Sequence, residues 1–160
     1  MVLLAQMEEI KDTKRSMVRI SFDGRVYKTF RATQARERFL NELYVLKYLE
    51  QKKCPFVPKI IDSNEENLEL TMTSCGQRIE QISAAKLKSL FDDLESFGVR
   101  HEDADLRNVT YLQREGRFCI IDFEYATILD DPNQKSPEKF PDKKDLVKAT
   151  AKARRTTLIK

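Results

Sequence analysis

Two groups of polar residues have the composition and spacing of a metal-dependent site for phosphate chemistry. His101-Glu102-Asp103 is followed by Asn108, and Asp122-Phe123-Glu124 begins fourteen residues after Asn108. Transfer of a phosphoryl group requires cations on the phosphates, oxygen ligands for Mg²⁺, and a carboxylate that orients and deprotonates the acceptor. The side chains of Asp103, Asn108 and Asp122 are of the kinds that supply the oxygen ligands and the carboxylate.

The residues around Asp122 separate this pattern from an ordinary polar turn. Val109 to Leu112 and Arg117 to Asp122 predict a hairpin that turns at Glu115-Gly116, and its second strand is almost purely apolar. A polar turn would explain the Asp and Asn residues but not an apolar strand that ends on Asp122. Carboxylates clustered at such a place would repel one another without a cation.

A strand lysine and a helical glutamate could complete the site. Lys28 lies in Arg25 to Phe30, which follows the hairpin signal Asp23-Gly24, and Glu42 lies in a stretch with helical spacing. A lysine on a stiff strand needs a carboxylate to keep it charged and aimed. The alternative is that both residues are solvated surface charges.

The strands and helices that must position these residues predict an α+β protein. Val2 to Ile10, Ser16 to Phe22 and Arg25 to Phe30 are expected to form three antiparallel strands. Two more are expected at Lys59 to Asp62 and Asn67 to Thr73, separated by the polar turn Ser63-Asn64-Glu65-Glu66.

Two helices are predicted. The first begins at an N-cap on Thr33 and ends near Lys53, before Pro55. The second is capped by Ser83, runs to about Phe97 and is closed by Gly98.

The order of these motifs resembles the protein-kinase-like superfamily over about 130 of the 160 residues, from about Val2 to Leu129. The resemblance implies an ATP and Mg²⁺ site in a minimal domain of residues 1–130. Its N-lobe, residues 1–75, would hold an antiparallel five-stranded sheet and one long helix. Its reduced helical C-lobe, residues 76–130, would carry the hairpin of the catalytic loop.

The resemblance also implies roles for single residues. Lys28 would bind the α and β phosphates and pair with Glu42, while Asp103 would be the base that orients the acceptor. Asn108 and Asp122 would bind Mg²⁺, and His101 would support the loop rather than act as a base. Further nucleotide contacts are expected from four residues: Lys14, Ser16, Met72 and Thr73.

The sequence departs from the family pattern at several positions. The turn between Ile10 and Val18 has no glycine, so the backbone cannot approach phosphates as closely as a glycine-rich turn does. Glu102 replaces an arginine that reads a phosphorylated activation loop, and Asp105 replaces a lysine near the transferred phosphate. Glu124 replaces glycine and gives Asp-Phe-Glu-Tyr, which resembles choline and ethanolamine kinases.

Composition limits the location of the protein and its other chemistry. Cys54, Cys75 and Cys119 have no Cys-x-x-Cys spacing, so reduced thiols are expected rather than a zinc site or a disulfide framework. No apolar stretch approaches the ~20 residues of a membrane span, and the start lacks a basic leader. We expect a soluble, cytoplasmic chain without a membrane partner.

The last thirty residues differ from the rest. Residues 131–160 are expected to form a proline-containing linker and a basic tail, with a short helix at Asp145 to Arg155. The formal net charge is +3, and residues 142–160 alone carry +5. Nothing after Leu129 resembles an Ala-Pro-Glu motif, so the tail, a partner protein or a second copy in a homodimer is expected to complete the acceptor site.

Three functional interpretations stay open. The first is an ATP-dependent kinase, with a protein Ser/Thr acceptor favoured over a small alcohol and with Thr150, Thr156 and Thr157 as candidate autophosphorylation sites. The second is a kinase-like pseudoenzyme that serves as a nucleotide-binding or protein-interaction module. The third, nucleic-acid binding by the tail, is disfavoured because its basic run lacks interleaved aromatic residues.

Overall fold

The structure is a computed structural model that describes residues 8–138. The strand predicted from Val2 therefore lies partly outside the described residues. The predicted tail helix and the three tail threonines lie wholly outside them. No helix within residues 8–138 is long and apolar enough to cross a bilayer.

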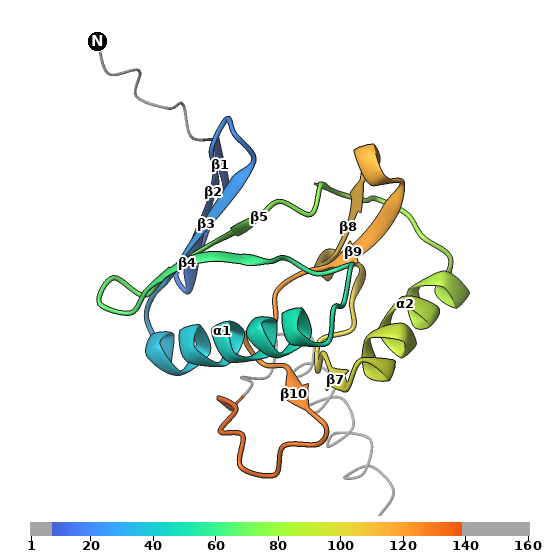
Figure 1. The fold of residues 1–160 in the computed structure, drawn as a ribbon. Coiled ribbons are helices and arrows are strands. Elements are labelled where there is room, and N and C mark those ends of the chain that lie inside the picture. Colours follow the sequence, from blue (N-terminus) through green and yellow to red (C-terminus); the bar gives the residue numbers. More distant parts are fainter. Residues whose placement is uncertain (1–7, 139–160) are drawn as a thin grey trace, which may run out of the picture.

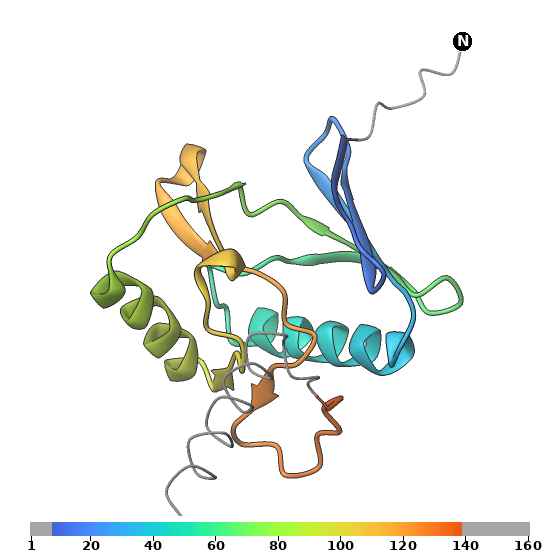
Figure 2. The same ribbon diagram turned by 180° about the vertical axis from the view of Figure 1, so that it is seen from behind.

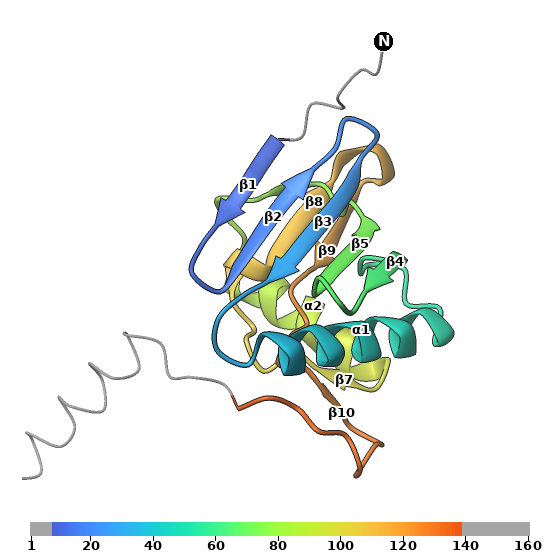
Figure 3. The ribbon, with the colours of Figure 1, turned by 90° about the vertical axis from the view of Figure 1, so that its left-hand side faces the viewer.

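The first half of the chain forms a five-stranded antiparallel sheet with one helix beneath it (Figures 1 and 3). The strands are β1 (Glu8–Asp12), β2 (Ser16–Ile20), β3 (Arg25–Phe30), β4 (Ile60–Asn64) and β5 (Glu69–Thr73), in the spatial order β1-β2-β3-β5-β4. The helix is α1 (Ala35–Gln51). This arrangement confirms the predicted α+β fold and the five-stranded N-lobe.

The predicted N-cap of α1 is wrong. The helix begins one residue later than a Thr33 cap requires, after Gln34, whose backbone is left-handed and whose side chain makes no capping hydrogen bond. The Thr33 carbonyl instead accepts a hydrogen bond of 3.1 Å from Arg38 Nε. Thr33 therefore does not cap the helix, because its carbonyl serves as a hydrogen-bond acceptor for the buried Arg38.

The turn between β4 and β5 is also displaced from its prediction. It occupies residues 65–68 rather than 63–66, since β4 continues through Asn64, which pairs with Glu69. The Asn64 side chain accepts a hydrogen bond of 3.0 Å from Asn67 N and so closes the turn locally.

The second half holds the other helix and a hairpin, which lie beside each other in Figure 2. Helix α2 (Ala84–Ser96) is capped by Ser83, whose Oγ accepts from Lys86 N at 3.1 Å, and it is closed by Gly98 at φ +90°. Both ends confirm the predicted capping. The hairpin consists of β8 (Val109–Leu112) and β9 (Arg117–Ile120), which are joined by the short 3₁₀ turn η2 (Gln113–Glu115).

The remaining strands connect this part of the chain to the loops around it. Strand β6 (Gln77–Arg78) pairs with β8, and β7 (Val99–Arg100) pairs with β10 (Thr127–Ile128). The segment between β7 and β8 contains the 3₁₀ turn η1 (Leu106–Asn108). Strand β9 stops at Ile120, two residues before its predicted end, because Asp122 adopts a left-handed backbone with φ +68° that cannot continue a strand.

Part of the predicted linker packs against α1. Gln134 Oε1 accepts a hydrogen bond of 2.6 Å from Ile128 N, and Gln134 Nε2 donates to Asn41 Oδ1 at 2.8 Å. Tyr44 on the same helix donates to Asp131 Oδ2 at 2.5 Å. The chain beyond Leu129 is thus tied to the N-lobe helix at least as far as Gln134.

One apolar core joins the two halves. Phe39, Leu46 and Leu49 of α1 pack in the same cluster as Leu94 of α2 and Phe123. The halves are therefore held by buried apolar contact, and the polar residues described next lie between them.

Candidate active site

The predicted pair of Lys28 and Glu42 is formed, and it is buried. Lys28 Nζ lies 2.7 Å from Glu42 Oε2, 3.0 Å from Asp122 Oδ1 and 3.4 Å from Glu124 Oε2. The Lys28 side chain is only 6% exposed. One ammonium group therefore holds together three carboxylates, from helix α1 and from the loop after β9.

The pKa values follow from burial and from this shared lysine. Burial would lower the pKa of Lys28, but the carboxylates of Asp122, Glu42 and Glu124 outweigh it and hold that pKa well above its usual range. Burial also acts on Asp122, where it is outweighed by Lys28 and Lys11, and the pKa of Asp122 falls to about 2. Asp122 is therefore ionised at neutral pH.

Glu42 behaves differently because it is the more deeply buried acid. Its side chain is 2% exposed against 26% for that of Asp122. Burial raises the pKa of Glu42 to about 7, against the opposing attraction of Lys28. Of these two carboxylates around one ammonium, Glu42 is the one that takes up a proton first.

Two residues of the loop between β7 and β8 hold the Asp103 carboxylate. Arg107 Nη2 lies 2.8 Å from Asp103 Oδ1 and 2.7 Å from Oδ2, and Asn108 Nδ2 donates to Asp103 Oδ2 at 3.0 Å. Asp105 caps η1 by accepting from Arg107 N at 3.0 Å, which places Arg107 and Asn108 on the side of Asp103. Because the amide nitrogen of Asn108 faces Asp103, its amide oxygen is the atom suited to a cation.

His101 connects the loop between β7 and β8 to the residues that follow β9. Its Nδ1 accepts a hydrogen bond from Asp103 N at 3.2 Å, so its Nε2 carries the proton and donates to Ile121 O at 2.9 Å. The ring also makes edge contacts with Phe91 and Phe123, at centroid distances of 5.3 and 5.1 Å. This geometry agrees with the supporting role that the resemblance implied.

Glu124 enlarges the acidic group that could hold a metal. Carboxylate oxygens of Glu42, Asp122 and Glu124 lie within 4.8 Å of one another. The sequence pointed to Asn108 and Asp122 as metal ligands, and these two line a common cavity. The substitution of Glu124 for the family glycine was visible in the sequence, but its place beside Lys28 was not.

Helix α1 presents one polar face to the loop of residues 122–126. Glu42 Oε1 accepts from Phe123 N at 3.3 Å, and Asn41 Nδ2 donates to the carbonyls of Glu124 and Ala126 at 3.0 and 3.1 Å. Arg38, which is 0% exposed, places Nη1 3.4 Å from Glu124 Oε2. Positions 38, 41 and 42 share a helical face, so the one helix fixes the whole loop.

The sequence did not indicate that Arg38 and Asn41 contact the loop of residues 122–126. Their burial could have been suspected only from their place in the helical stretch, where polar residues at helical spacing from Glu42 lie next to the apolar residues Phe39 and Val45.

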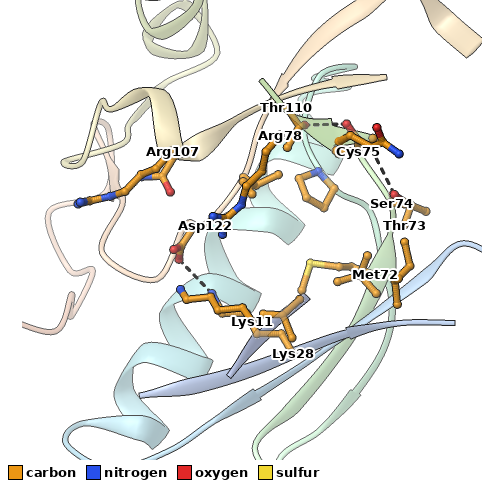
Figure 4. Close-up of a pocket in the computed structure, with 18 of the residues that line it drawn as sticks. Lys11, Lys28, Met72, Thr73, Ser74, Cys75, Arg78, Arg107, Thr110 and Asp122 are labelled. Carbon is orange, nitrogen blue, oxygen red and sulfur yellow. Dashed lines mark hydrogen bonds and ion pairs between the residues drawn. The ribbon is translucent and has the colours of Figure 1, made fainter. Parts of the chain in front are cut away.

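A cavity of about 580 Å³ lies between the five-stranded sheet and the β8–β9 hairpin (Figure 4). Apolar side chains of the sheet, among them Val18, Ile20 and Val26, form one wall. Six of the predicted site residues line it together: Lys28, Glu42, Met72, Thr73, Asn108 and Asp122. Its size and its mixture of apolar walls with a few charged groups are typical of a small-molecule site.

A second cavity, of about 420 Å³, adjoins the first. Asp103 lines it together with Lys14 and Ser16, and Asp122 borders both cavities. Lys14 and Ser16 were predicted to contact the nucleotide, but they line only this smaller cavity. Lys11, which lies in β1 just before the β1–β2 turn, lines both cavities.

The five-stranded sheet, the helix that supplies Glu42, and the loop and hairpin that supply Asp103, Asn108 and Asp122 are together the fold of the protein-kinase-like superfamily. Solved structures with this fold include the streptomycin-ATP-APH(2″)-IIa ternary complex, with a TM-score of 0.55 at 12% identity over 78% of this chain and 67% of that chain. No protein-family model matches the sequence, and no curated protein does so either.

A second similar structure is the ADP/Mg²⁺-phosphoaspartate complex of Rio2 kinase from Chaetomium thermophilum. Its TM-score is 0.54 at 20% identity, over 80% of this chain and 49% of that chain. The chain thus spans about half the length of that kinase. At such identities the likeness shows the fold alone.

Proposed function

We propose that this chain is an ATP- and Mg²⁺-dependent phosphotransferase. The observation that carries the proposal is the position of Lys28, which is buried, held by Glu42 at 2.7 Å and by Asp122 at 3.0 Å, and lines the same cavity as Asn108. Burial of a lysine with three carboxylates costs desolvation free energy, and charged groups are retained in such clusters at functional sites. Binding of a polyphosphate and its metal would be such a function.

Each residue of the site would have a separate role. Lys28 would bind phosphate oxygens, with Glu42 fixing its position. Asp122 and the amide oxygen of Asn108 would hold Mg²⁺, and Glu124 adds a second carboxylate beside Asp122. When bound, Mg²⁺ would neutralise charge on the phosphates.

Asp103 would orient the acceptor and receive its proton. The acceptor oxygen forms a bond to the γ phosphorus, the bond from that phosphorus to the β–γ bridging oxygen breaks, and ADP leaves with that oxygen. Arg107, held against Asp103 at 2.7 Å, would place a positive charge where the transferred group passes.

The complexes of the two similar structures support nucleotide use, because one contains ATP and the other ADP and Mg²⁺. For the acceptor we favour a serine or threonine of a protein, with autophosphorylation as one form of it. A small-molecule alcohol is the alternative. A partner protein or a second copy of the chain would complete the acceptor side.

One observation favours the second candidate, a kinase-like pseudoenzyme. The turn between β1 and β2 is closed by Thr13, whose Oγ1 accepts hydrogen bonds from Arg15 N at 3.3 Å and from Ser16 N at 3.2 Å. These backbone amides are therefore already paired and do not face a phosphate. A module that binds nucleotide weakly or not at all would have such a turn.

Measurement of Mg²⁺-dependent ATP binding and of radiolabelled phosphate transfer separates the two candidates. Wild type should bind ATP and transfer phosphate, whereas Asp122→Asn should lose both and Asp103→Asn should lose transfer alone. Asp92→Asn, which changes an exposed carboxylate on α2, is the matched control and should retain both. ATP binding without any transfer would identify a pseudoenzyme, and absence of ATP binding would refute the proposal.

A further inference from the structure

A β-bulge turns Lys11 into the larger cavity. Glu9 pairs with Arg19, but Lys11 pairs with Val18, so strand β1 carries one extra residue at position 10. If β1 continued the register of Glu8 and Glu9 without a bulge, Lys11 would lie opposite Met17, on the other face of the sheet, because side chains alternate along a strand. The bulge is thus what brings a cation to the cavity side.

The row of side chains around Lys11 confirms this orientation. Val18 lines the cavity and lies between Lys11 on β1 and Lys28 on β3, which is its partner on the other side. Cross-strand partners point to the same face. Lys11 and Lys28 therefore stand on one face, two strand spacings or roughly 10 Å apart.

A second cation enters from the opposite wall. Arg78 on β6 pairs with Thr110 on β8, and Thr110 lines the cavity, so Arg78 faces it too. Gly76 allows this pairing, since a Cβ there would lie 2.0 Å from Tyr111 O. In Figure 4 the Arg78 side chain extends toward the end of the cavity that holds Asp122 and Lys28.

Lys11 and Arg78 differ from the other cations of the cavity in forming no ion pair among the described residues. Lys28 is occupied by three carboxylates and Arg107 by Asp103, whereas the ion pairs within residues 8–138 include neither Lys11 nor Arg78. Lys11 lies near enough to Asp122 to contribute to the lowered pKa of that carboxyl.

We propose that Lys11 and Arg78 bind the phosphate chain of the nucleotide through their side chains, in place of the backbone amides that a glycine-rich turn provides. The inference rests on the proposed function. Lysine and arginine suit this task because both make charge-assisted hydrogen bonds to phosphate oxygens. Adenosine has no phosphate, so its binding affinity should not depend on either residue.

Calorimetric titration with ATP and with adenosine, both in the presence of Mg²⁺, tests the inference. Lys11→Gln and Arg78→Gln should each weaken ATP binding about tenfold and leave adenosine binding unchanged, and the double variant should lose about a hundredfold for ATP. Lys11→Arg keeps the charge and should retain ATP affinity. Arg114→Gln removes an exposed cation outside the cavity and should behave as wild type.

The outcomes separate this inference from the proposed function. If wild type binds ATP and the glutamine variants keep its preference for ATP over adenosine, the inference is wrong and the proposed function stands. An equal loss of ATP and adenosine affinity would also overturn it, since that indicates a distorted cavity. Failure of the wild-type protein to bind ATP would contradict both the inference and the proposed function.

Discussion

Arg38 and Glu124, 86 residues apart in sequence, meet in an ion pair of 3.4 Å between a guanidinium that is 0% exposed and a carboxylate that also contacts Lys28. Arg38 further donates to the carbonyls of Arg31 at 2.5 Å, Thr33 at 3.1 Å and Arg15 at 3.3 Å. This one side chain therefore joins the start of α1, the β1–β2 turn and the loop that carries Asp122.

Replacement of Arg38 should be strongly destabilising. Arg38→Met leaves Glu124 and three carbonyls without their buried donor, and loss of one partner of a buried ion pair costs about 3–5 kcal/mol. Urea unfolding measures this change. Arg36→Met removes an exposed arginine of the same helix that pairs with Glu65, and should cost less than about 1 kcal/mol. Equal effects of the two substitutions would contradict the buried network.

A double-mutant cycle should show that Arg38 and Glu124 act together. Glu124→Gln leaves the buried guanidinium without its carboxylate, and the Arg38→Met/Glu124→Gln double variant should lose less stability than the two single variants add up to. Coupled contacts of this kind give interaction energies of about 0.5–3 kcal/mol. The cycle is measured from free energies of unfolding, and additivity within error would mean that the two side chains do not interact.

The stability of the metal-free protein should carry a pH dependence that comes from Glu42. Its pKa rises from an ordinary 4.5 to about 7 on folding, because of burial, so the folded state binds the proton more tightly. The stabilisation from this proton is complete below pH 4.5 and is lost as the pH rises through about 7. Glu42→Gln, which cannot titrate, should flatten that decline.

Asp122 should act in the opposite direction at low pH. Its pKa is lowered from 3.8 to about 2, so its contribution is present above pH 3.8 and is lost as the pH falls through about 2. Thermal unfolding in a chelator, from about pH 1.5 to 8, measures both effects. A Glu42→Gln profile parallel to that of wild type between pH 5 and 8 would rule out the raised pKa.

Gly76 should be required for the approach of β6 to the hairpin. Gly76→Ala introduces a Cβ 2.0 Å from Tyr111 O at φ +88°, and we expect a loss of more than about 2 kcal/mol in stability together with weaker ATP binding. Gly24→Ala is the matched control. It has φ +81° but no atom within 4 Å of the new Cβ, so only about 1 kcal/mol of backbone strain is expected.

Local sequence patterns determined much of this protein. Alternating residues and the Asp23-Gly24 turn predicted the hairpin of β2 and β3, and Ser83 and Gly98 marked both ends of α2, because strand pairing, caps and turns depend on neighbouring residues. The spacing from His101 to Asn108, followed by an apolar strand toward Asp122, pointed to Asn108 and Asp122, which line one cavity.

Only the tertiary structure decided which cations face that cavity and what holds its acidic loop. The bulge at position 10 reverses the face on which Lys11 lies, and no local signal in the residues around it indicated an extra residue in the strand. The pairing of Arg38 with Glu124 depends on how α1 packs against a loop 86 residues further along the chain. Such contacts depend on how whole elements pack. In the sequence alone, the residues that make them are therefore indistinguishable from ordinary surface charges.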